Sequence, residues 1–196
     1  MTADRVRPPA VTRGIELPGV RAPAVGLEQP FEMLAACHER VTRMLGLLAR
    51  LQQHLHDTGC DDAARQAARD VMRYFDLAAP LHHEDEELHV FPPLLAGDDA
   101  VVRKLVLRLQ HDHRQMEAAW ALARQTLQTV ADGEPSGWRP LQAGQTAALD
   151  HFAALYQQHL VHEDETVYPA AQAMLTDAAL EAMSADMMRR RGVKAG

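Results

Sequence analysis

A histidine followed four residues later by a glutamate occurs twice in the chain, each time ahead of an aromatic residue and a proline. The aromatic residue lies nine residues after the histidine and the proline ten residues after it. The two copies consist of His82, Glu86, Phe91 and Pro92, and of His159, Glu163, Tyr168 and Pro169. Positions i and i+4 of an α-helix lie on one face, so each copy presents an imidazole and a carboxylate in the same direction. Two such helices facing each other predict a metal site inside a helical bundle.

The elements that must position these residues are four long segments with the apolar spacing of helices. They are expected at about 31–57, 62–91, 99–131 and 141–168, with breaks at 58–61, 96–99 and 132–140. We expect the prolines after the two repeated segments to end their helices, because proline lacks the N–H that the next turn needs. A shorter apolar pattern predicts a fifth helix over 176–191.

The fold class expected from this order is all-α. It is an up-down-up-down antiparallel four-helix bundle with a short C-terminal fifth helix and an extended N-terminal arm. The chain divides into an extended or disordered arm rich in Pro and Arg, the bundle, and a C-terminal helix with a basic tail, at 1–29, 30–170 and 171–196.

Composition limits the classes of function. The 196 residues are 47% hydrophobic but only 5% aromatic, which favours helices. The net charge of −7 argues against a nucleic-acid partner, and the run Arg189–Arg191 is expected to compensate a helix dipole. No apolar run is long enough for a membrane span, and no signal peptide is apparent. Cys37 and Cys60 lack the spacing of a disulfide framework or thiolate site, so we expect a cytoplasmic protein without membrane contact.

One histidine lies on the apolar stripe of each predicted helix, and all four are expected at one level of the bundle. In an antiparallel hairpin, the midpoint between two facing residues falls in the turn. The midpoints of His38 with His82, His82 with His113 and His113 with His159 all fall in the predicted breaks. The four imidazoles should therefore meet.

These four imidazoles and the two inward carboxylates predict a metal centre. Buried carboxylates are costly unless a cation compensates them. Nitrogen ligands favour first-row transition metals over Ca²⁺ or Mg²⁺, and a single tetrahedral Zn²⁺ would leave ligands over. The simplest arrangement is two non-haem irons, each held by two histidines, with Glu86 and Glu163 as bridges and an oxo group as a further possible bridge. Such a centre has open positions for O₂, NO or peroxide.

The same geometric tests exclude other candidates. His111 lies about 160° round the helix from His113 and should point outward. His83 lies about 100° off the stripe, and Asp164 about 140° off it, so Glu163 is the better ligand. Three further residues are candidates for supporting roles beside the metal ligands: Glu117, Tyr156 and His162.

The order of these motifs resembles the hemerythrin-like, HHE cation-binding family over about residues 31–170. The segments that carry the resemblance are His38, His82-His83-x-x-Glu86-Glu87 with Phe91-Pro92, Asp112-His113, and His159-x-x-x-Glu163 with Tyr168-Pro169. The resemblance implies a non-haem di-iron bundle with ligands His38, His82, Glu86, His113, His159 and Glu163.

The ligand count places the resemblance with the four-histidine, two-glutamate bacterial branch, which includes iron-centre repair proteins and stress-related iron or gas sensors. Hemerythrins that carry O₂ have a fifth histidine one turn after the third-helix ligand, where this chain has Glu117. The repair proteins usually carry an N-terminal cysteine motif, and residues 1–29 contain no cysteine.

Three functions remain open at this stage. The first is a di-iron protein that binds or senses O₂, NO or peroxide, or buffers iron. The second is a di-iron enzyme: an oxidase, a peroxidase, an NO-processing catalyst or an iron-centre repair protein. The third is a structural or interaction module that holds Zn²⁺ or no metal.

Overall fold

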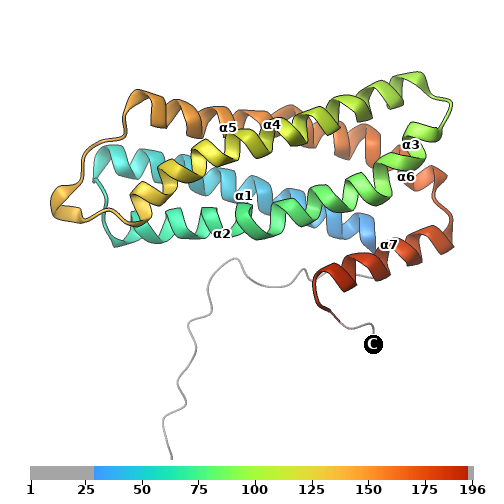
Figure 1. Cartoon of the computed structure of the whole chain (residues 1–196), viewed down its shortest axis with the longest axis horizontal. Helices are drawn as coiled ribbons and strands as arrows, with labels where there is room; N and C mark the ends of the chain where they lie inside the picture. Colours follow the sequence, from blue (N-terminus) through green and yellow to red (C-terminus); the bar gives the residue numbers. More distant parts are fainter. Residues whose placement is uncertain (1–28, 194–196) are drawn as a thin grey trace, which may run out of the picture.

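The four predicted long helices form an antiparallel bundle (Figure 1). The computed structural model describes residues 29–193, so nearly all of the predicted arm at 1–29 lies outside the described residues. Helix α1 packs on α2, α2 on α4, α4 on α5 and α5 on α1, which closes the bundle. The elements are α1 (Pro30–Asp57), α2 (Asp62–Asp85), η1 (Glu86–Val90), α3 (Phe91–Ala96), α4 (Ala100–Ala131), η2 (Pro135–Gly137), α5 (Ala143–His162), η3 (Glu163–Val167), α6 (Tyr168–Met174) and α7 (Asp177–Arg190). The all-α prediction is confirmed.

Helices α2, α4, α5 and α7 begin at residues that cap them. The Asp61 side chain accepts a hydrogen bond from the backbone N–H of Ala64 at the start of α2. Asp99 caps α4, Thr176 caps α7, and Gln142 forms a capping box with Gln145 at α5. These side chains satisfy N–H groups that have no partner within the helix. The predicted breaks therefore stop and restart the helices where expected.

The two prolines of the repeated segments do not end their helices, and this prediction was wrong. Each helix passes through one π-helical turn, η1 or η3, and continues as α3 to Ala96 or as α6 to Met174. The backbone N–H of Phe91 bonds to the carbonyl of Glu86, and that of Tyr168 to the carbonyl of Glu163. A proline ring clashes with the carbonyl four residues earlier in a regular α-helix. The wider π turn relieves this clash, so the proline is accommodated in the first turn that follows.

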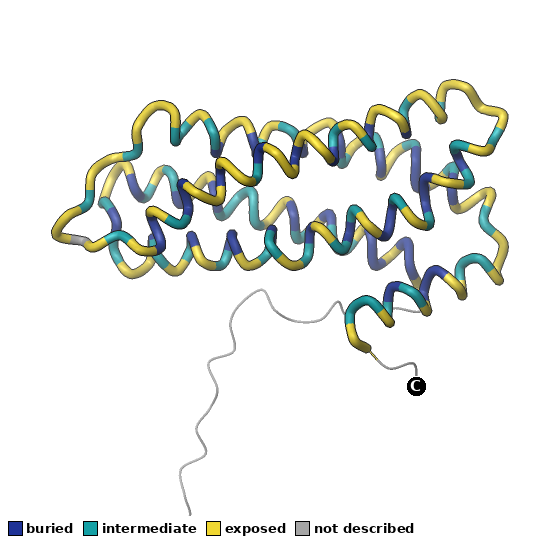
Figure 2. The backbone as a smooth tube through the Cα atoms, viewed as in Figure 1, coloured by how far each residue is buried: buried dark blue, intermediate teal, exposed yellow. Residues whose placement is uncertain are grey.

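Two apolar clusters fill the bundle, one on each side of a layer of buried polar residues. The buried residues lie along the inner faces of the helices (Figure 2). One cluster extends toward the α1–α2 turn and includes Leu48, Phe75 and Phe152. The other includes Phe91 and Leu109 and lies toward α7. In every long helix, the predicted metal-binding residues lie between members of the two clusters, so packing on both sides holds the polar layer in place.

The C-terminal helix α7 packs beside α1 and α2 and is fixed by buried charges. Asp85 of α2 is completely buried and pairs with both Arg190 and Arg191. Nη2 of Arg191 lies 2.5 Å from Oδ2 of Asp85. The arginine run was expected to compensate a helix dipole. In the structure it also supplies the counter-charge of a buried carboxylate beside the site.

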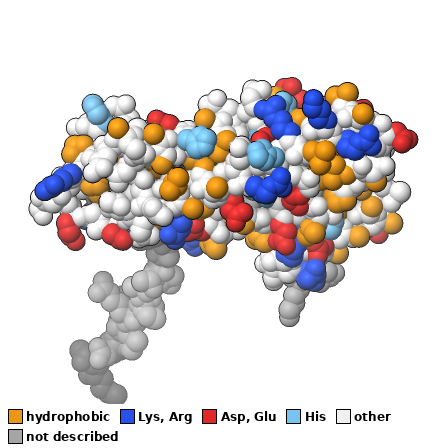
Figure 3. Space-filling view, turned by 45° about the horizontal axis from the view of Figure 1, so that its top comes forward, with side chains coloured by type: hydrophobic (Ala, Val, Ile, Leu, Met, Phe, Trp, Pro, Cys, Tyr) orange, Lys and Arg blue, Asp and Glu red, His pale blue; other side chains and the backbone are white. Residues whose placement is uncertain are grey.

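The surface in Figure 3 is mixed in charge. Lys and Arg side chains lie among Asp and Glu side chains, and hydrophobic side chains are scattered between them on this face. Within the part of the chain that the structure describes, no helix combines the length and hydropathy that a bilayer crossing requires.

Candidate metal centre

The structure brings all six predicted ligand residues together in the polar layer. His38 comes from α1, His113 from α4, and the two His-x-x-x-Glu pairs from α2 with η1 and from α5 with η3. Every one of the six is buried, with at most 7% of its surface exposed. Both glutamates are wholly inaccessible to solvent.

The four histidines form two pairs. Nε2 of His38 lies 3.0 Å from Nε2 of His82, and Nε2 of His113 lies 3.2 Å from Nε2 of His159. Two nitrogens that are each about 2.1 Å from one metal ion, at a right angle, would be about 3 Å apart. The spacing within each pair therefore suits one metal ion per pair.

The two carboxylates lie between the histidine pairs, and each turns one oxygen toward each pair. Oε1 of Glu86 is 3.5 Å from Nε2 of His82, whereas Oε2 is 3.5 Å from Nε2 of His113. Oε2 of Glu163 is 3.3 Å from Nε2 of His38, whereas Oε1 is 2.9 Å from Nε2 of His159. This is the arrangement that carboxylates bridging two ions require.

The hydrogen bonding of this layer is incomplete, which tests whether metal ions fit. Oε2 of Glu86 and both carboxylate oxygens of Glu163 have no hydrogen-bond partner, although imidazole nitrogens lie near them. Buried polar groups in folded proteins nearly always have partners. Cations between the nitrogens and oxygens would supply them, so the residues fit a metal centre.

The two carboxyl groups also affect each other's ionisation in the metal-free protein. Burial, and then the charge of Glu163, raise the pKa of Glu86 well above its usual range. Burial acts in the same direction on Glu163, but the charge of His159 and the close imidazoles of His113 and His38 hold its pKa well below the usual value. Two carboxylates this close cannot both ionise easily without added positive charge.

Comparison with known proteins agrees with this geometry. The family model of the hemerythrin HHE cation-binding domain matches residues 29–171, which include all six predicted ligand residues. This chain belongs to the hemerythrin HHE cation-binding family. An uncharacterized protein of Haemophilus influenzae is 29% identical over 167 residues, covering 85% of this chain and 92% of its own length. The resemblance drawn from the motifs is thus confirmed, and with it the expectation of a cation-binding domain.

Acidic side chains hydrogen-bond two of the histidines of this HHE domain from behind. Oδ1 of Asp164 lies 2.8 Å from Nδ1 of His38, and Oε1 of Glu87 lies 3.0 Å from Nδ1 of His113. Asp112 is farther from His159, at 3.7 Å from its Nδ1. A carboxylate on Nδ1 fixes the tautomer that turns Nε2 toward a metal. Sequence reasoning had only set Asp164 aside as a ligand. The signal for its role was the acid that follows the glutamate in both copies of the repeat.

The aromatic residues of the repeat also lie against the histidines. The ring of Tyr168 stacks on His38 with centroids 5.2 Å apart, and that of Phe91 stacks on His113 at 5.6 Å. The Tyr168 hydroxyl lies 2.9 Å from Nε2 of His38 and donates a hydrogen bond to Oε1 of Glu86. Sequence reasoning treated both aromatics only as markers of helix ends and missed their place in the site.

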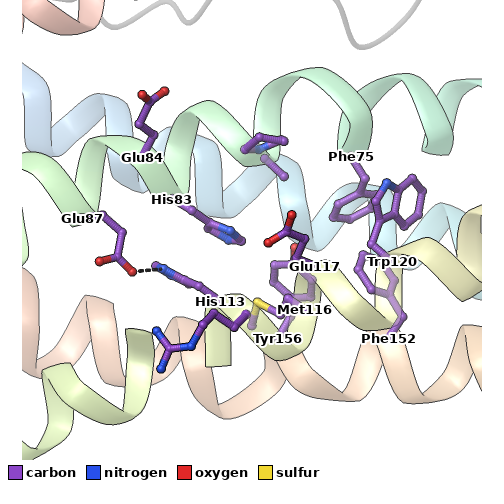
Figure 4. A pocket seen from close by; sticks show the side chains of 13 residues that line it. Phe75, His83, Glu84, Glu87, His113, Met116, Glu117, Trp120, Phe152 and Tyr156 are labelled. Atoms are coloured by element: carbon purple, nitrogen blue, oxygen red, sulfur yellow. Dashed lines mark hydrogen bonds and ion pairs between the residues drawn. The ribbon is translucent and has the colours of Figure 1, made fainter. Parts of the chain in front are cut away.

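A cavity of about 350 Å³ opens between α2 and α4 and reaches the second histidine pair (Figure 4). Phe75, Trp120, Phe152 and Tyr156 line its inner part, and His83 and His113 lie at the metal side. The His83 ring is stacked on His113 with centroids 4.0 Å apart. His83 was set aside as off the stripe, but its ring lies close to the centre, and burial lowers its pKa well below the usual value. A neutral imidazole therefore borders the second pair.

The predicted supporting residues have different positions. Glu117 is exposed and lines the cavity. Tyr156 is buried with its ring 6.5 Å from that of His159, and burial raises the pKa of its phenol. His162 is half-buried, and its Nδ1 has no hydrogen-bond partner among the described residues. His111 is exposed, as its helical position predicted.

Proposed function

We propose that this protein binds two iron ions in the polar layer and uses them to bind or sense O₂, NO or peroxide, or to buffer iron. The observation that carries this proposal is the position of the carboxylates. Glu86 and Glu163 each direct one oxygen to the His38–His82 pair and the other to the His113–His159 pair. A single ion would need only one of the pairs.

The donor set supports iron over the alternatives. Ca²⁺ and Mg²⁺ are hard ions that prefer oxygen ligands, so four imidazole nitrogens match them poorly. Zn²⁺ in structural sites binds four ligands in a tetrahedron and leaves no coordination position open. Two tetrahedral zincs would therefore use these six residues differently from a pair of ions with open positions. When bound, two irons supply redox chemistry and exchangeable coordination positions. The protein's own residues hold the ions, orient the imidazoles through Asp164 and Glu87, and exclude bulk water.

Access for a small ligand is supported by the cavity at His113. Its volume of about 350 Å³ lies at the low end of the range for ligand pockets, and its inner walls are largely aromatic. Such a cavity admits O₂, NO or peroxide without opening the bundle. Glu117 and Tyr156, which line it, are the residues that a catalytic alternative would use for proton or electron transfer.

Metal analysis of iron-reconstituted protein tests the first part of the proposal. We expect about two irons per chain, falling to one or fewer in His82→Ala because one pair then loses a ligand. His151→Ala, at an exposed histidine of α5, is the matched control and should keep both irons. No more than one metal per chain in the wild type, or full iron content in His82→Ala, would contradict the proposal. Zinc alone in protein purified without added metal would favour a structural module.

Absorption spectra under nitrogen, O₂ and NO test the second part. A spectral change that is stoichiometric with iron supports binding or sensing. Sustained consumption of peroxide or NO, lost in Glu117→Gln or Tyr156→Phe proteins that keep both irons, would instead support an enzyme. A spectrum that is the same under all three gases would leave only the iron-buffering role.

A further inference from the structure

The Tyr168 hydroxyl is a polar group within the metal layer whose role the six-residue ligand set does not explain. Tyr168 is 5% exposed, and its oxygen lies 2.9 Å from Nε2 of His38. It also contacts Oε1 of Glu86, the oxygen that faces the His38–His82 pair. The phenol oxygen therefore lies beside two donor atoms that converge on the same ion position.

Among the described residues, no hydroxyl takes this place beside the other histidine pair. Phe91 occupies the equivalent position of the first repeat and stacks on His113 at nearly the same angle as Tyr168 on His38, 21° against 20°. The aromatic ring is thus common to both halves of the layer, whereas the oxygen is present in one half only. Ring packing alone accounts for Phe91 but not for the hydroxyl of Tyr168.

Metal binding changes what the hydroxyl can contact. The Tyr168 hydroxyl donates its one proton to Oε1 of Glu86, so its oxygen lies 2.9 Å from Nε2 of His38 without donating to the Nε2 lone pair. When that lone pair binds an ion, the phenol oxygen lies within reach of the same ion. A bound cation favours deprotonation of a neighbouring ligand and releases the proton to solvent.

We propose that the Tyr168 phenolate oxygen is a ligand of the ion held by His38 and His82. This inference rests on the proposed two-iron function. The two ions are then unequal: the first has a phenolate in its shell, whereas the His113 ligand of the second lies against the rings of Phe91 and His83. The second ion, beside His113 and the cavity, is the one that exchanges small ligands.

Absorption and resonance Raman spectra of the iron-loaded full chain test this inference. Ferric iron with a phenolate ligand has a visible charge-transfer band and enhanced phenolate ring modes. We expect these features in the wild type and their complete loss in Tyr168→Phe, with two irons still bound. Tyr74→Phe is the matched control, since it also removes one hydroxyl, which bonds to the backbone carbonyl of Cys37 and not to a ligand side chain, and it should keep the band.

Iron content separates the possible failures. Two irons per chain without phenolate modes in the wild type, or with modes that persist in Tyr168→Phe, would overturn the role of Tyr168 alone. A wild type that holds no more than one iron would overturn the proposed function and this inference with it. Circular dichroism of both variants checks that the bundle is intact.

Discussion

Oδ1 of Asp164 lies 2.8 Å from Nδ1 of His38, on the side of the imidazole away from His82. The two residues are 126 positions apart and come from η3 and α1. Asp164 therefore holds the His38 ring with Nε2 turned toward the centre of the layer.

We predict that Asp164→Asn weakens binding of the first metal ion by about 10- to 100-fold, the usual effect of losing such a partner. The amide keeps the size of the side chain but removes its charge. Competition with a chelator of known affinity measures the change. Glu165→Gln, at the exposed neighbouring position, should bind metal like the wild type. Equal affinities for Asp164→Asn and the wild type would show that Asp164 does not orient the ligand.

The cavity beside His113 makes a kinetic prediction. Glu117→Trp should place a bulky side chain in the cavity and slow NO binding to the iron-loaded protein several-fold, without changing the iron content. Stopped-flow absorption measures the association rate. Gln115→Trp adds the same bulk at an exposed position of α4 that does not line the cavity, and its rate should be unchanged. Unchanged rates for both variants would mean that small ligands enter elsewhere.

The contacts of α7 predict a stability effect. Asp85→Ala should lower the free energy of unfolding of the metal-free protein by about 2–3 kcal/mol. This is below the full loss for a broken buried pair, because both arginines keep some access to water. Urea denaturation measures it. Glu84→Ala removes the half-exposed partner of Arg190 and should cost less than about 1 kcal/mol. Similar losses for the two variants would contradict the buried role of Asp85.

The hydrogen bonds of Asp186 in α7 predict that the stability of the protein depends on pH. A hydrogen bond from His89, together with Arg190 and Arg189, holds the pKa of Asp186 well below its usual value. A lowered pKa in the folded state stabilises the protein above the unfolded pKa, near 4, and this stabilisation is lost as the pH falls further.

The metal-free wild type should therefore exceed Asp186→Asn in stability by up to about 1 kcal/mol at pH 5, since solvent screens these pairs. The difference should shrink toward pH 2 as Asp186 becomes protonated. Urea denaturation of both proteins across this range gives the two curves. A gap that stays constant with pH would argue against an ionised Asp186 as its source.

The level and face of the site could be predicted from the sequence because both depend on simple geometry. Equal distances from a turn place His38, His82, His113 and His159 at one height, and a spacing of four residues aligns each glutamate with its histidine. These rules hold for regular α-helices with short turns. The long helices of the structure follow these rules, α2 and α5 as far as Glu86 and Glu163, which are the first residues of the two π turns.

Tyr168 could not be placed in this way, because the helix is not regular between it and Glu163. Five residues of α-helix would rotate Tyr168 by about 140° from Glu163, away from the centre. The π turn η3 takes up one extra residue and reduces this rotation to about 40°. The residue pattern alone does not predict that π turn. The carboxylates behind the histidines were missed for a related reason, since they act across helices rather than along them.

The hydrogen bonds between acidic side chains and the Nδ1 atoms of the histidines join the two halves of the chain. Glu87, from the first half, supports His113 of the second, and Asp164, from the second half, supports His38 of the first. Each helical hairpin therefore contains one histidine and one acid whose hydrogen-bond partners lie in the other hairpin. Two identical hairpins related by a twofold axis would complete each other. The bundle thus resembles an interlocked dimer joined into one polypeptide, in which His38 and His113 each take their acidic partner from the other half.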